Sequence, residues 1–356
     1  MASSALEALV ACAKVIQDGN LNLADSLLKR IWNLDAHESD PEKSEVVKYF
    51  AEALVRRAYG LSSPSAYLSL PTPPPIDFFA YLCRDAIKTA WMGKKRFHFI
   101  TFFFPTLYDW ICLLNLLAGD SQSFRISVIV SPFLENIVKI QQEIGKHELT
   151  TEAMKRGIKL EALRVVYANS LGAVDASEAD FTRTTDEAVI VYYKYKLHQL
   201  LADAGVMEKE LLKLRQINPE IVIIQELYAD HNDSNFIKRL EDSFQYYLHL
   251  DSFHRNKYCC RREIVNIVGC EGRDRLERHQ TLSQWRSLLL ANGLLPVPLR
   301  PDVYSIVHED NGCLVSQVRD RPLYFISAWK LTDAVDHFNP ISFNPIQGIF
   351  LMAMFY

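Results

Sequence analysis

Cysteine is sparse in this sequence, and none of it is arranged as a disulfide framework or a metal knuckle. The seven cysteines among 356 residues are scattered, odd in number and never spaced C-x-x-C. A chain of this length can bury a sizeable core without covalent cross-links, so we expect reduced thiols in an intracellular protein. No zinc-ligand set is recognisable, and neither a metal nor a cofactor is expected.

Long apolar runs and a basic excess are also missing. No segment approaches the roughly 20 apolar residues that a membrane span needs. The N-terminal MASSALEALVACAKVI lacks a basic leader and carries Glu7, which predicts an amphipathic helix and not a signal peptide. The chain has 39 basic and 43 acidic residues, a formal net charge of -4. Because basic side chains supply most of the affinity for phosphate backbones, we expect only weak or indirect DNA contact. No membrane contact is expected.

Glycine is absent from the turn where a nucleotide site would need it. RFHFITFFFPTLYDW, residues 96–110, has the pattern of a buried strand, a turn and a helix. A phosphate or adenosyl cofactor at such a strand end needs glycines, whose backbone N–H groups it can approach, and an acid after the strand. The turn instead contains larger residues: Phe103, Phe104, Pro105 and Leu107. We therefore predict a packed strand end, with His98 as a core residue and not a ligand.

Hydrophobic periodicity divides the chain into a helical part and an alternating part. Residues 1–60 carry three amphipathic stripes, which predict a helical cap. Residues 61–76 are rich in Ser and Pro and are expected to be a linker. From 77 to 333, continuous apolar strands alternate with helices, which predicts an α/β domain with a mostly parallel sheet. After residue 300, short antiparallel strands are expected at the edge of that sheet. Residues 334–356 form an extension to which we assign no role.

One polar segment is a candidate for a binding or catalytic site. QELYADHND closes a predicted strand and places Glu226, Asp230 and His231 near the carboxyl edge of the sheet, where open α/β proteins bind ligands. A metal site or an acid–base site is one interpretation. The interpretation favoured from the pattern is a polar loop in which Asn232 or Asp233 caps the next helix.

Two charged segments are interpreted as structural. RNKYCCRR is expected to be a solvated loop. Its alternative roles are a nuclear import signal and contact with phosphate through four basic residues: Arg255, Lys257, Arg261 and Arg262. Within residues 270–293, one long amphipathic helix is expected after Gly272, with Asp274 paired to Arg278 across a helical turn.

Two L-x-x-L-L matches, LLNLL at 113–117 and LHQLL at 197–201, have the pattern with which a helix presents leucines to a partner groove. A core stripe is the favoured interpretation for both. Leu113 and Leu117 are kept as candidate partner contacts.

Five stretches, in order, resemble the motifs of the GRAS family of plant transcriptional regulators, from about residue 6 to residue 331. LVACAKVIQDGNLNLADSLLKRI with VVKYFAEALVRRAYGLS is similar to the first leucine-rich region, and KKRFHFITFFFPTLYDW to the VHIID region. VIVYYKYKLHQLL, LRQINPEIVIIQE and FIKRLEDSFQYYLHLDSF resemble the stretch that leads into the PFYRE region. CEGRDRLERHQTLSQWR is similar to the RVER element, and GCLVSQVRDRPLYFISAWK to the SAW motif. The similarity is greatest to the DELLA branch.

The resemblance implies a Rossmann-like, methyltransferase-type α/β core with an N-terminal helical cap. It also implies a non-catalytic activity: family members act in the nucleus as scaffolds that bind transcription factors and one another, without strong DNA specificity of their own. The residues that match family motifs are expected to be structural: His98, Trp110, Arg275, Glu277, Arg278, Trp285, Ser327 and Trp329. Partner contacts are expected from the cap, at Leu9, Leu23, Leu27 and Leu28, and from the strands at the SAW end.

The sequence departs from the family pattern at its VHIID region and its N-terminus. The aspartate of the family falls at Thr101 and the glycine at Leu107. The DELLA and TVHYNP segments, through which that branch is bound by the gibberellin receptor, do not precede the leucine-rich region. If the chain is whole, hormone-triggered destruction by that route is not expected.

The working hypothesis is a nuclear transcriptional co-regulator, not an enzyme, in gibberellin-related or developmental signalling. Three alternatives stay open: a small-molecule binder or methyltransferase-like enzyme that uses the sheet crevice, a DNA binder, and a divergent paralogue with reduced activity.

Overall fold

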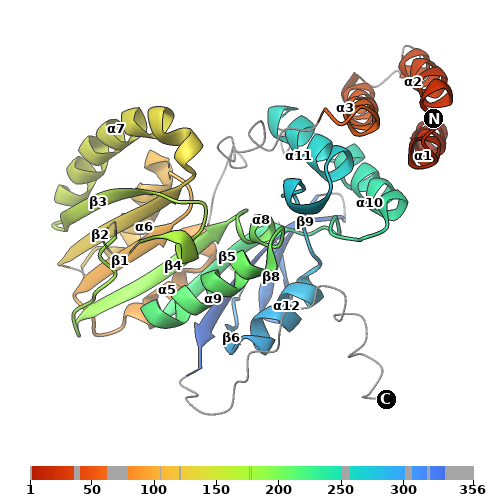
Figure 1. Ribbon diagram of the computed structural model, residues 1–356. Coiled ribbons are helices and arrows are strands. Elements are labelled where there is room, and N and C mark those ends of the chain that lie inside the picture. The colour runs from red at the N-terminus through yellow and green to blue at the C-terminus, as the bar shows by residue number, and fades with distance from the viewer. Residues whose placement is uncertain are drawn as a thin grey trace, which may run out of the picture.

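The computed structural model describes residues 2–35, 41–61, 79–104, 106–119, 122–175, 177, 179–250, 257–300, 307–318 and 321–332. Helices cover both faces of one sheet, and a second group of helices lies to one side of it (Figure 1). The predicted linker from residue 62 onward and the extension 334–356 lie outside the described residues.

Five parallel strands form one half of the sheet: β1 (Arg96–Thr101), β2 (Ser123–Val130), β3 (Lys159–Tyr167), β4 (Glu187–Lys194) and β5 (Ile221–Leu227). Their order, β3-β2-β1-β4-β5, is that of a doubly wound Rossmann-like sheet. The side chains of β1, β2, β4 and β5 are mostly buried, as expected for strands covered on both faces, whereas β3 at the end of the sheet has only two buried residues.

Four later strands complete the sheet: β6 (Leu294–Val297), β7 (Val307–Asp310), β8 (Cys313–Val318) and β9 (Arg321–Leu331). All their pairings are antiparallel, as predicted for the strands after residue 300, whereas β6 was not predicted. The predicted edge position is wrong for β9, which lies between β5 and β8. An antiparallel strand therefore lies next to the last parallel one, and the expected Rossmann-like α/β fold class is confirmed.

The sheet has an apolar core on each face. One core is formed with α4 (Phe79–Leu82), α5 (Arg84–Trp91), α6 (Leu107–Leu117) and α7 (Glu135–Met154). The other is formed with α8 (Leu197–Leu200), α9 (Ala204–Ile217) and α12 (Leu282–Ala291).

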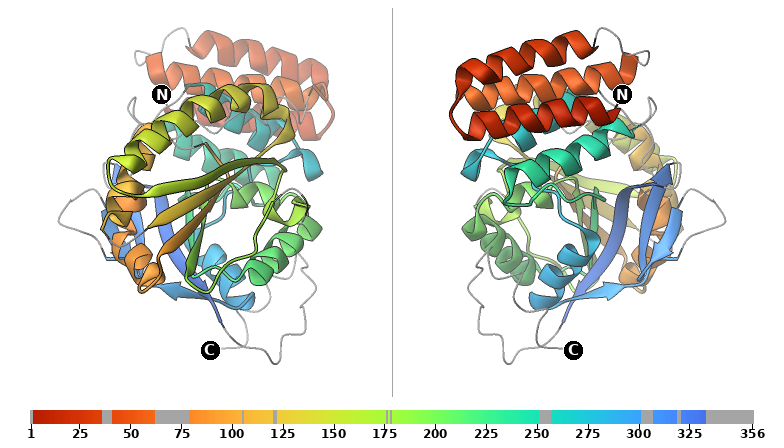
Figure 2. Two further views of the ribbon diagram at one scale, coloured as in Figure 1. Left: turned by 90° about the vertical axis from the view of Figure 1, so that its left-hand side faces the viewer. Right: turned by 90° about the vertical axis from the view of Figure 1, so that its right-hand side faces the viewer.

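The cap contains more than the first 60 residues. The three predicted N-terminal helices are present as α1 (Ala2–Gln17), α2 (Leu21–Asp35) and α3 (Pro41–Ala58). They share one apolar core with α10 (Phe236–Leu248) and α11 (Lys257–Gly269), for example through Phe50, whose ring centroid lies 5.2 Å from that of Phe244. Figure 2 shows the first three helices lying against these two. The predicted boundary at residue 60 therefore misses two helices that come from within the core sequence.

Two charged segments differ from the predictions. Residues 270–293 are not one helix: a 3-10 turn at Gly272–Asp274 is followed by an extended segment, and α12 begins only after Thr281, whose side chain caps it. RNKYCCRR is helical from residue 257 onward, in α11, and is not a solvated loop. The amphipathic pattern predicted the long helix, but the buried residues of 275–279 alternate with half-buried ones, which is the period of an extended chain.

Candidate functional site

The strand end of β1 is packed with aromatic side chains. The ring of Phe102 stacks on Tyr193 with centroids 4.3 Å apart, and the ring of Phe103 meets Tyr192 edge-on at 5.5 Å. Phe102 and Phe103 are buried, and Phe104 packs against the same core as Phe103. The prediction of a packed strand end is confirmed for Phe103 and Phe104. It is wrong for Leu107, which is 37% exposed, and Pro105 lies outside the described residues.

The helix N-terminus that follows this strand already holds a carboxylate. Asp109 accepts hydrogen bonds from the backbone N–H of Thr106 at 2.7 Å and from its hydroxyl at 2.8 Å, which closes a capping box on α6. In a nucleotide site this position receives a phosphate. Nearby, His98 is buried and its Nε2 lies 2.9 Å from the Ser127 hydroxyl, as expected of a core histidine.

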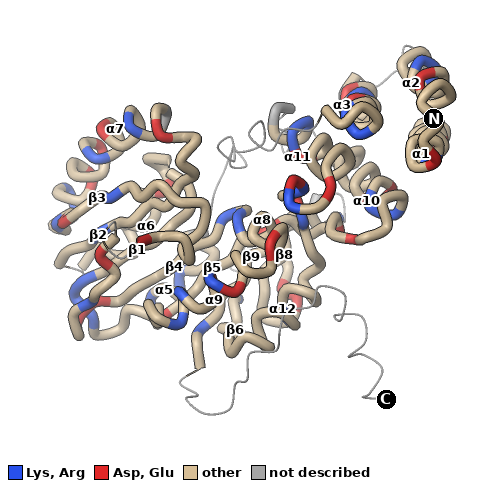
Figure 3. Tube along the Cα trace, viewed as in Figure 1, with Lys and Arg blue, Asp and Glu red and all other residues tan. Residues whose placement is uncertain are grey.

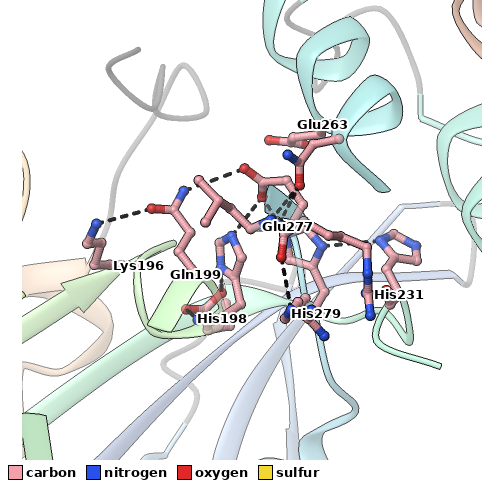
Figure 4. A network of polar contacts seen from close by, with 12 residues as sticks. Lys196, His198, Gln199, His231, Glu263, Glu277 and His279 are labelled. Carbon is pink, nitrogen blue, oxygen red and sulfur yellow. Dashed lines mark hydrogen bonds and ion pairs between the residues drawn. The ribbon is translucent and has the colours of Figure 1, made fainter. Parts of the chain in front are cut away.

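Buried ionisable side chains gather instead near the carboxyl ends of β4 and β5. His198 lies in the first turn of α8, shortly after β4, and Glu226 lies near the end of β5. Glu277 and His279 come from the extended segment before α12, and His231 from the loop after β5. We call these five residues the histidine–carboxylate cluster. Each is at most 2% exposed, and Figure 4 shows His198, Glu277, His279 and His231 directed toward one another.

Hydrogen bonds and one longer polar contact link the cluster. His198 contacts Glu226 Oε2 through Nδ1 at 2.7 Å and Glu277 Oε2 through Nε2 at 2.8 Å. The same Glu277 oxygen lies 3.5 Å from His279 Nε2. His279 Nδ1 in turn lies 3.2 Å from His231 Nδ1. One imidazole thus bridges two carboxylates, and one carboxylate faces two imidazoles.

Burial and neighbouring charges separate the protonation states of the three histidines. Burial lowers the pKa of His198, but Glu226 and Glu277 outweigh it and raise that pKa to about 10. Burial lowers the pKa of His231 to about 3, and burial together with the charge on His198 lowers the pKa of His279 well below its ordinary value. Burial alone would raise the pKa of Glu277, but His198 holds it below its usual range. At neutral pH one imidazolium therefore lies between two carboxylates.

Side chains of the cap helices contact this cluster and the segment that carries it. The side-chain oxygen of Asn266 on α11 accepts hydrogen bonds from the backbone N–H groups of Leu276 at 2.7 Å and Glu277 at 2.8 Å. Glu263 on the same helix accepts a hydrogen bond from the Tyr247 hydroxyl at 2.6 Å. Burial and the charge of Glu277 raise the pKa of Glu263 to about 7. The cluster is consequently a joint between cap and core.

The outcome for the predicted polar loop is mixed. The favoured interpretation is wrong for Glu226 and His231, whose side chains are buried in the cluster. Asp230 does not join them, because its carboxylate lies 3.6 Å from Lys238 Nζ on the surface side of the loop. The cap of α10 is Asn235, and not Asn232 or Asp233.

Sequence reasoning missed His198 and His279 as members of the cluster. The position of His198 in the sequence could have indicated its role, because it follows the strand β4 in the same way that the predicted polar loop follows β5. No comparable signal marks His279, because it lies in a segment with the pattern of an amphipathic helix.

The burial of the cluster limits its chemistry. Because every member is nearly inaccessible to solvent, the cluster can bind a proton or an ion but cannot contact a bulky substrate in this conformation.

The motif-matching residues are buried except Arg278, which is half-buried. Arg275 donates to the His231 carbonyl at 3.0 Å, and Arg278 donates to the carbonyl of Gly272 at 2.6 Å and to Asn232 Oδ1 at 3.1 Å. The predicted Asp274–Arg278 pair is therefore replaced by contacts within the loop. Three tryptophans and a serine are buried: Trp110, Trp285, Ser327 and Trp329. The Trp329 indole donates to the Ser327 hydroxyl at 2.9 Å.

Most candidate partner contacts are buried. Four of the leucines have at most 5% of their surface exposed and cannot meet a partner in the folded chain: Leu9, Leu28, Leu113 and Leu117. Leu27 is partly buried against the cap core. Leu23 is 46% exposed and is the member of the set that lies clearly on the surface.

The basic residues considered for DNA contact do not form a basic surface in the described part of the chain. Arg261 pairs with Glu52 at 2.6 Å, which joins α11 to α3. Arg255 and the Lys257 side chain lie outside the description. Figure 3 shows acidic and basic residues interspersed along the helices, which gives no support to a dedicated DNA-binding face.

Exposed apolar side chains collect on and beside α7. Ile140, Ile144 and Met154 are 66%, 56% and 72% exposed, and Phe133 in the turn before the helix is 67% exposed. Ile140 and Ile144 are one helical turn apart, and Phe133, Ile140 and Met154 lie in a repeat of sevens whose remaining position is the exposed His147. The four apolar residues can therefore lie on one side of the helix, with His147 among them. We call these four residues the α7 stripe.

None of the described helices is both long enough and apolar enough to pass through a membrane.

Comparisons with known proteins agree with this architecture. Residues 5–330 match the GRAS domain family. The chain is 34% identical to DELLA protein RGA of Arabidopsis thaliana, an alignment that covers 92% of this chain and 62% of that protein. It is also 34% identical to DELLA protein 2 of Medicago truncatula, with 92% and 68% covered. The chain thus spans roughly two thirds of the length of these relatives.

A solved structure shows the same fold. The crystal structure of SCL7 from Oryza sativa superimposes with a TM-score of 0.72 at 22% identity, covering 92% of this chain and 99% of that one.

Proposed function

The chain belongs to the GRAS domain family, and from this premise we propose that it is a nuclear transcriptional co-regulator that holds transcription factors, and other members of its family, through protein–protein contacts. The DELLA relatives extend the proposal to gibberellin-related or developmental signalling in a plant. DNA is reached through the bound partner, and the protein itself carries out no catalysis.

The observation that carries this proposal is the α7 stripe. Its four side chains are each more than half exposed, and α7 lies at the outer flank of the sheet, away from the cap (Figure 1). Clustered apolar residues on a protein surface mark interaction sites. A repeat of sevens on one helix fits the apolar side of a second helix, so the partner segment is expected to be an amphipathic helix.

The strand end of β1 supports a non-catalytic role. Phe102 and Phe103 fill the space where a cofactor would bind, and Asp109 occupies the helix N-terminus where its phosphate or carboxylate would lie. An adenosyl cofactor at this edge would have to displace both the aromatic rings and the capping carboxylate.

A tethered reporter assay tests the proposal. The chain is fused to a heterologous DNA-binding domain in plant protoplasts, and a luciferase gene downstream of the matching site is measured, with the fluorescent fusion located by microscopy. We expect nuclear fluorescence and a change in luciferase of at least several-fold. The double variant Ile140→Asp, Ile144→Asp is expected to lose this change, because charges on the stripe prevent apolar docking.

The matched control is Leu212→Asp, which places the same charge on α9 at a leucine that is 53% exposed. It is expected to retain the activity. Unaltered luciferase with the wild-type chain would refute the regulatory role, whereas equal activity of all three proteins would refute the stripe as the docking surface.

A further inference from the structure

The histidine–carboxylate cluster has the donor atoms of a transition-metal site. Three of its residues, His198, Glu277 and His279, each have one ligand atom that lies within 4.8 Å of those of the other two. Two imidazole nitrogens and a carboxylate oxygen are a set with which proteins bind zinc. We propose that these three residues bind one zinc-type divalent ion at the joint between cap and core.

The distances in the cluster are close to those that a zinc ion requires. With metal–ligand bonds of about 2.0–2.2 Å in tetrahedral geometry, neighbouring ligand atoms lie about 3.3 Å apart. His279 Nε2 and Glu277 Oε2 are 3.5 Å apart, and His198 Nε2 and Glu277 Oε2 are 2.8 Å apart. An ion at this point takes the place of the proton between His198 and Glu277, and it requires the imidazole rings of His198 and His279, whose centroids are 4.1 Å apart, to move away from each other.

The outer contacts of both histidines are those of metal ligands. Metal-binding histidines usually donate their second ring N–H to a carboxylate or another acceptor, which fixes the orientation of the ring. His198 Nδ1 contacts Glu226 Oε2 at 2.7 Å, so that its Nε2 is the atom directed at Glu277. His279 Nδ1 lies 3.2 Å from His231 Nδ1, which can accept its proton. Both rings are thus held with Nε2 toward the same carboxylate oxygen.

The position of the ligands also suits a structural ion. His198 lies on α8 in the core, whereas Glu277 and His279 belong to the segment held by Asn266 of the cap helix α11. One ion bound to all three would join the two parts of the molecule. Its nitrogen donors favour zinc over magnesium or calcium, which prefer all-oxygen sites.

Metal analysis of the full chain tests this proposal. The protein is purified without chelator, equilibrated with Zn²⁺ at about pH 8 and passed through a desalting column, after which zinc is measured by inductively coupled plasma mass spectrometry. We expect about one zinc per chain and a melting temperature that falls when the ion is removed with a strong chelator and returns when Zn²⁺ is restored.

Variants assign the ion to the cluster. His279→Gln and Glu277→Gln are expected to lose most of the bound zinc, whereas the control His147→Gln, at an exposed histidine of α7, keeps it. Cobalt bound to the chelator-treated wild type is expected to give the visible absorption of a tetrahedral site, a readout that needs no folded variant. Less than a tenth of a zinc per wild-type chain with an unchanged melting temperature would overturn the proposal, as would equal zinc in wild type and His279→Gln.

Discussion

At the scale of single residues, the His198 imidazole connects carboxylates from two different parts of the chain. Glu226 lies on β5 and Glu277 in the segment before α12, and both contact the same ring at 2.7 and 2.8 Å. Removing one partner of such a buried group leaves the other charge without compensation, which costs more than the pair contributes when intact. The side chains of the cluster therefore depend on one another for stability.

A pH dependence of stability follows from His198. Its folded pKa of about 10 lies above the ordinary value, so its stabilising effect is complete below about pH 6.5 and is lost as the pH rises through the folded value. In protein treated with a chelator, the free energy of unfolding is expected to fall by on the order of a few kcal/mol between about pH 7 and pH 10. Urea unfolding at several pH values measures it.

The variant that isolates this effect is His198→Gln, which cannot titrate. Its free energy of unfolding is expected to be lower than that of wild type near neutral pH and to change less between about pH 7 and pH 10. His147→Gln serves as the control for loss of an exposed histidine. Parallel pH profiles of wild type and His198→Gln would show that the carboxylates do not hold the imidazolium.

At the scale of elements, an extended segment joins α11 to α12. Its buried residues carry charges or ring nitrogens: Arg275, Glu277 and His279. A helix here would turn only part of this set inward, whereas the extended chain directs every second residue toward the joint. The Asn266 side chain holds the segment by accepting from two backbone N–H groups and by donating to the Asp274 carbonyl at 2.9 Å.

Asn266→Ala tests this role. The backbone N–H groups of Leu276 and Glu277 would lose their acceptor in buried surroundings, at a cost of roughly 2–4 kcal/mol in the free energy of unfolding. Chemical denaturation measures the difference. Asn33→Ala, at an exposed position on α2, is the matched control and is expected to change stability by less than about 0.5 kcal/mol. A loss for Asn266→Ala no larger than that of the control would contradict the role given to this side chain.

At the scale of the whole molecule, the cap and the core are interleaved. The chain forms α1–α3 first, builds the parallel half of the sheet, and returns to the cap with α10 and α11 before completing the sheet with β6–β9. Ion pairs reinforce this return: Arg57 of α3 contacts Glu271 at 2.8 Å, and the same carboxylate pairs with Arg239 of α10. The cap is therefore a product of distant segments and not an independent N-terminal domain.

Removal of residues 1–60 is expected to destabilise the remaining chain. The deletion would expose apolar side chains of α10 and α11 that are buried against the first three helices, among them Leu240, Phe244 and Ile264. We expect a melting temperature lower by at least several degrees, or aggregation, measured by thermal unfolding and gel filtration. An unchanged melting temperature in a monomeric product would contradict the shared core.

A loss of partner binding in that deletion would not by itself identify a binding surface, because the deletion also opens the core. Leu23→Asp is the better test of the cap surface, because it alters an exposed leucine without opening the core.

The element order and the fold class were predictable from the sequence, and so was the packed strand end of β1. Continuous apolar runs and helical stripes are local patterns, and burial on both faces of a parallel sheet produces them directly. The bulky residues Phe103 and Phe104 and the missing glycine likewise identify the packed turn without reference to any other part of the chain. The boundary of the cap was not predictable, because the amphipathic faces of α10 and α11 do not indicate which helices they pack against.

The sequence by itself determined that this protein has a Rossmann-like core with helical cap segments, because secondary structure and burial follow from the spacing of apolar residues. Only the tertiary structure decided which ionisable residues meet. His198, Glu226 and Glu277 belong to segments whose local patterns predict a helix, a strand and a helix. None of these local patterns indicates that the three side chains contact one another. Their contact depends on strand order and on the return of the chain to the cap, since a hydrogen bond between distant segments is set by the path of the backbone and not by neighbours in sequence.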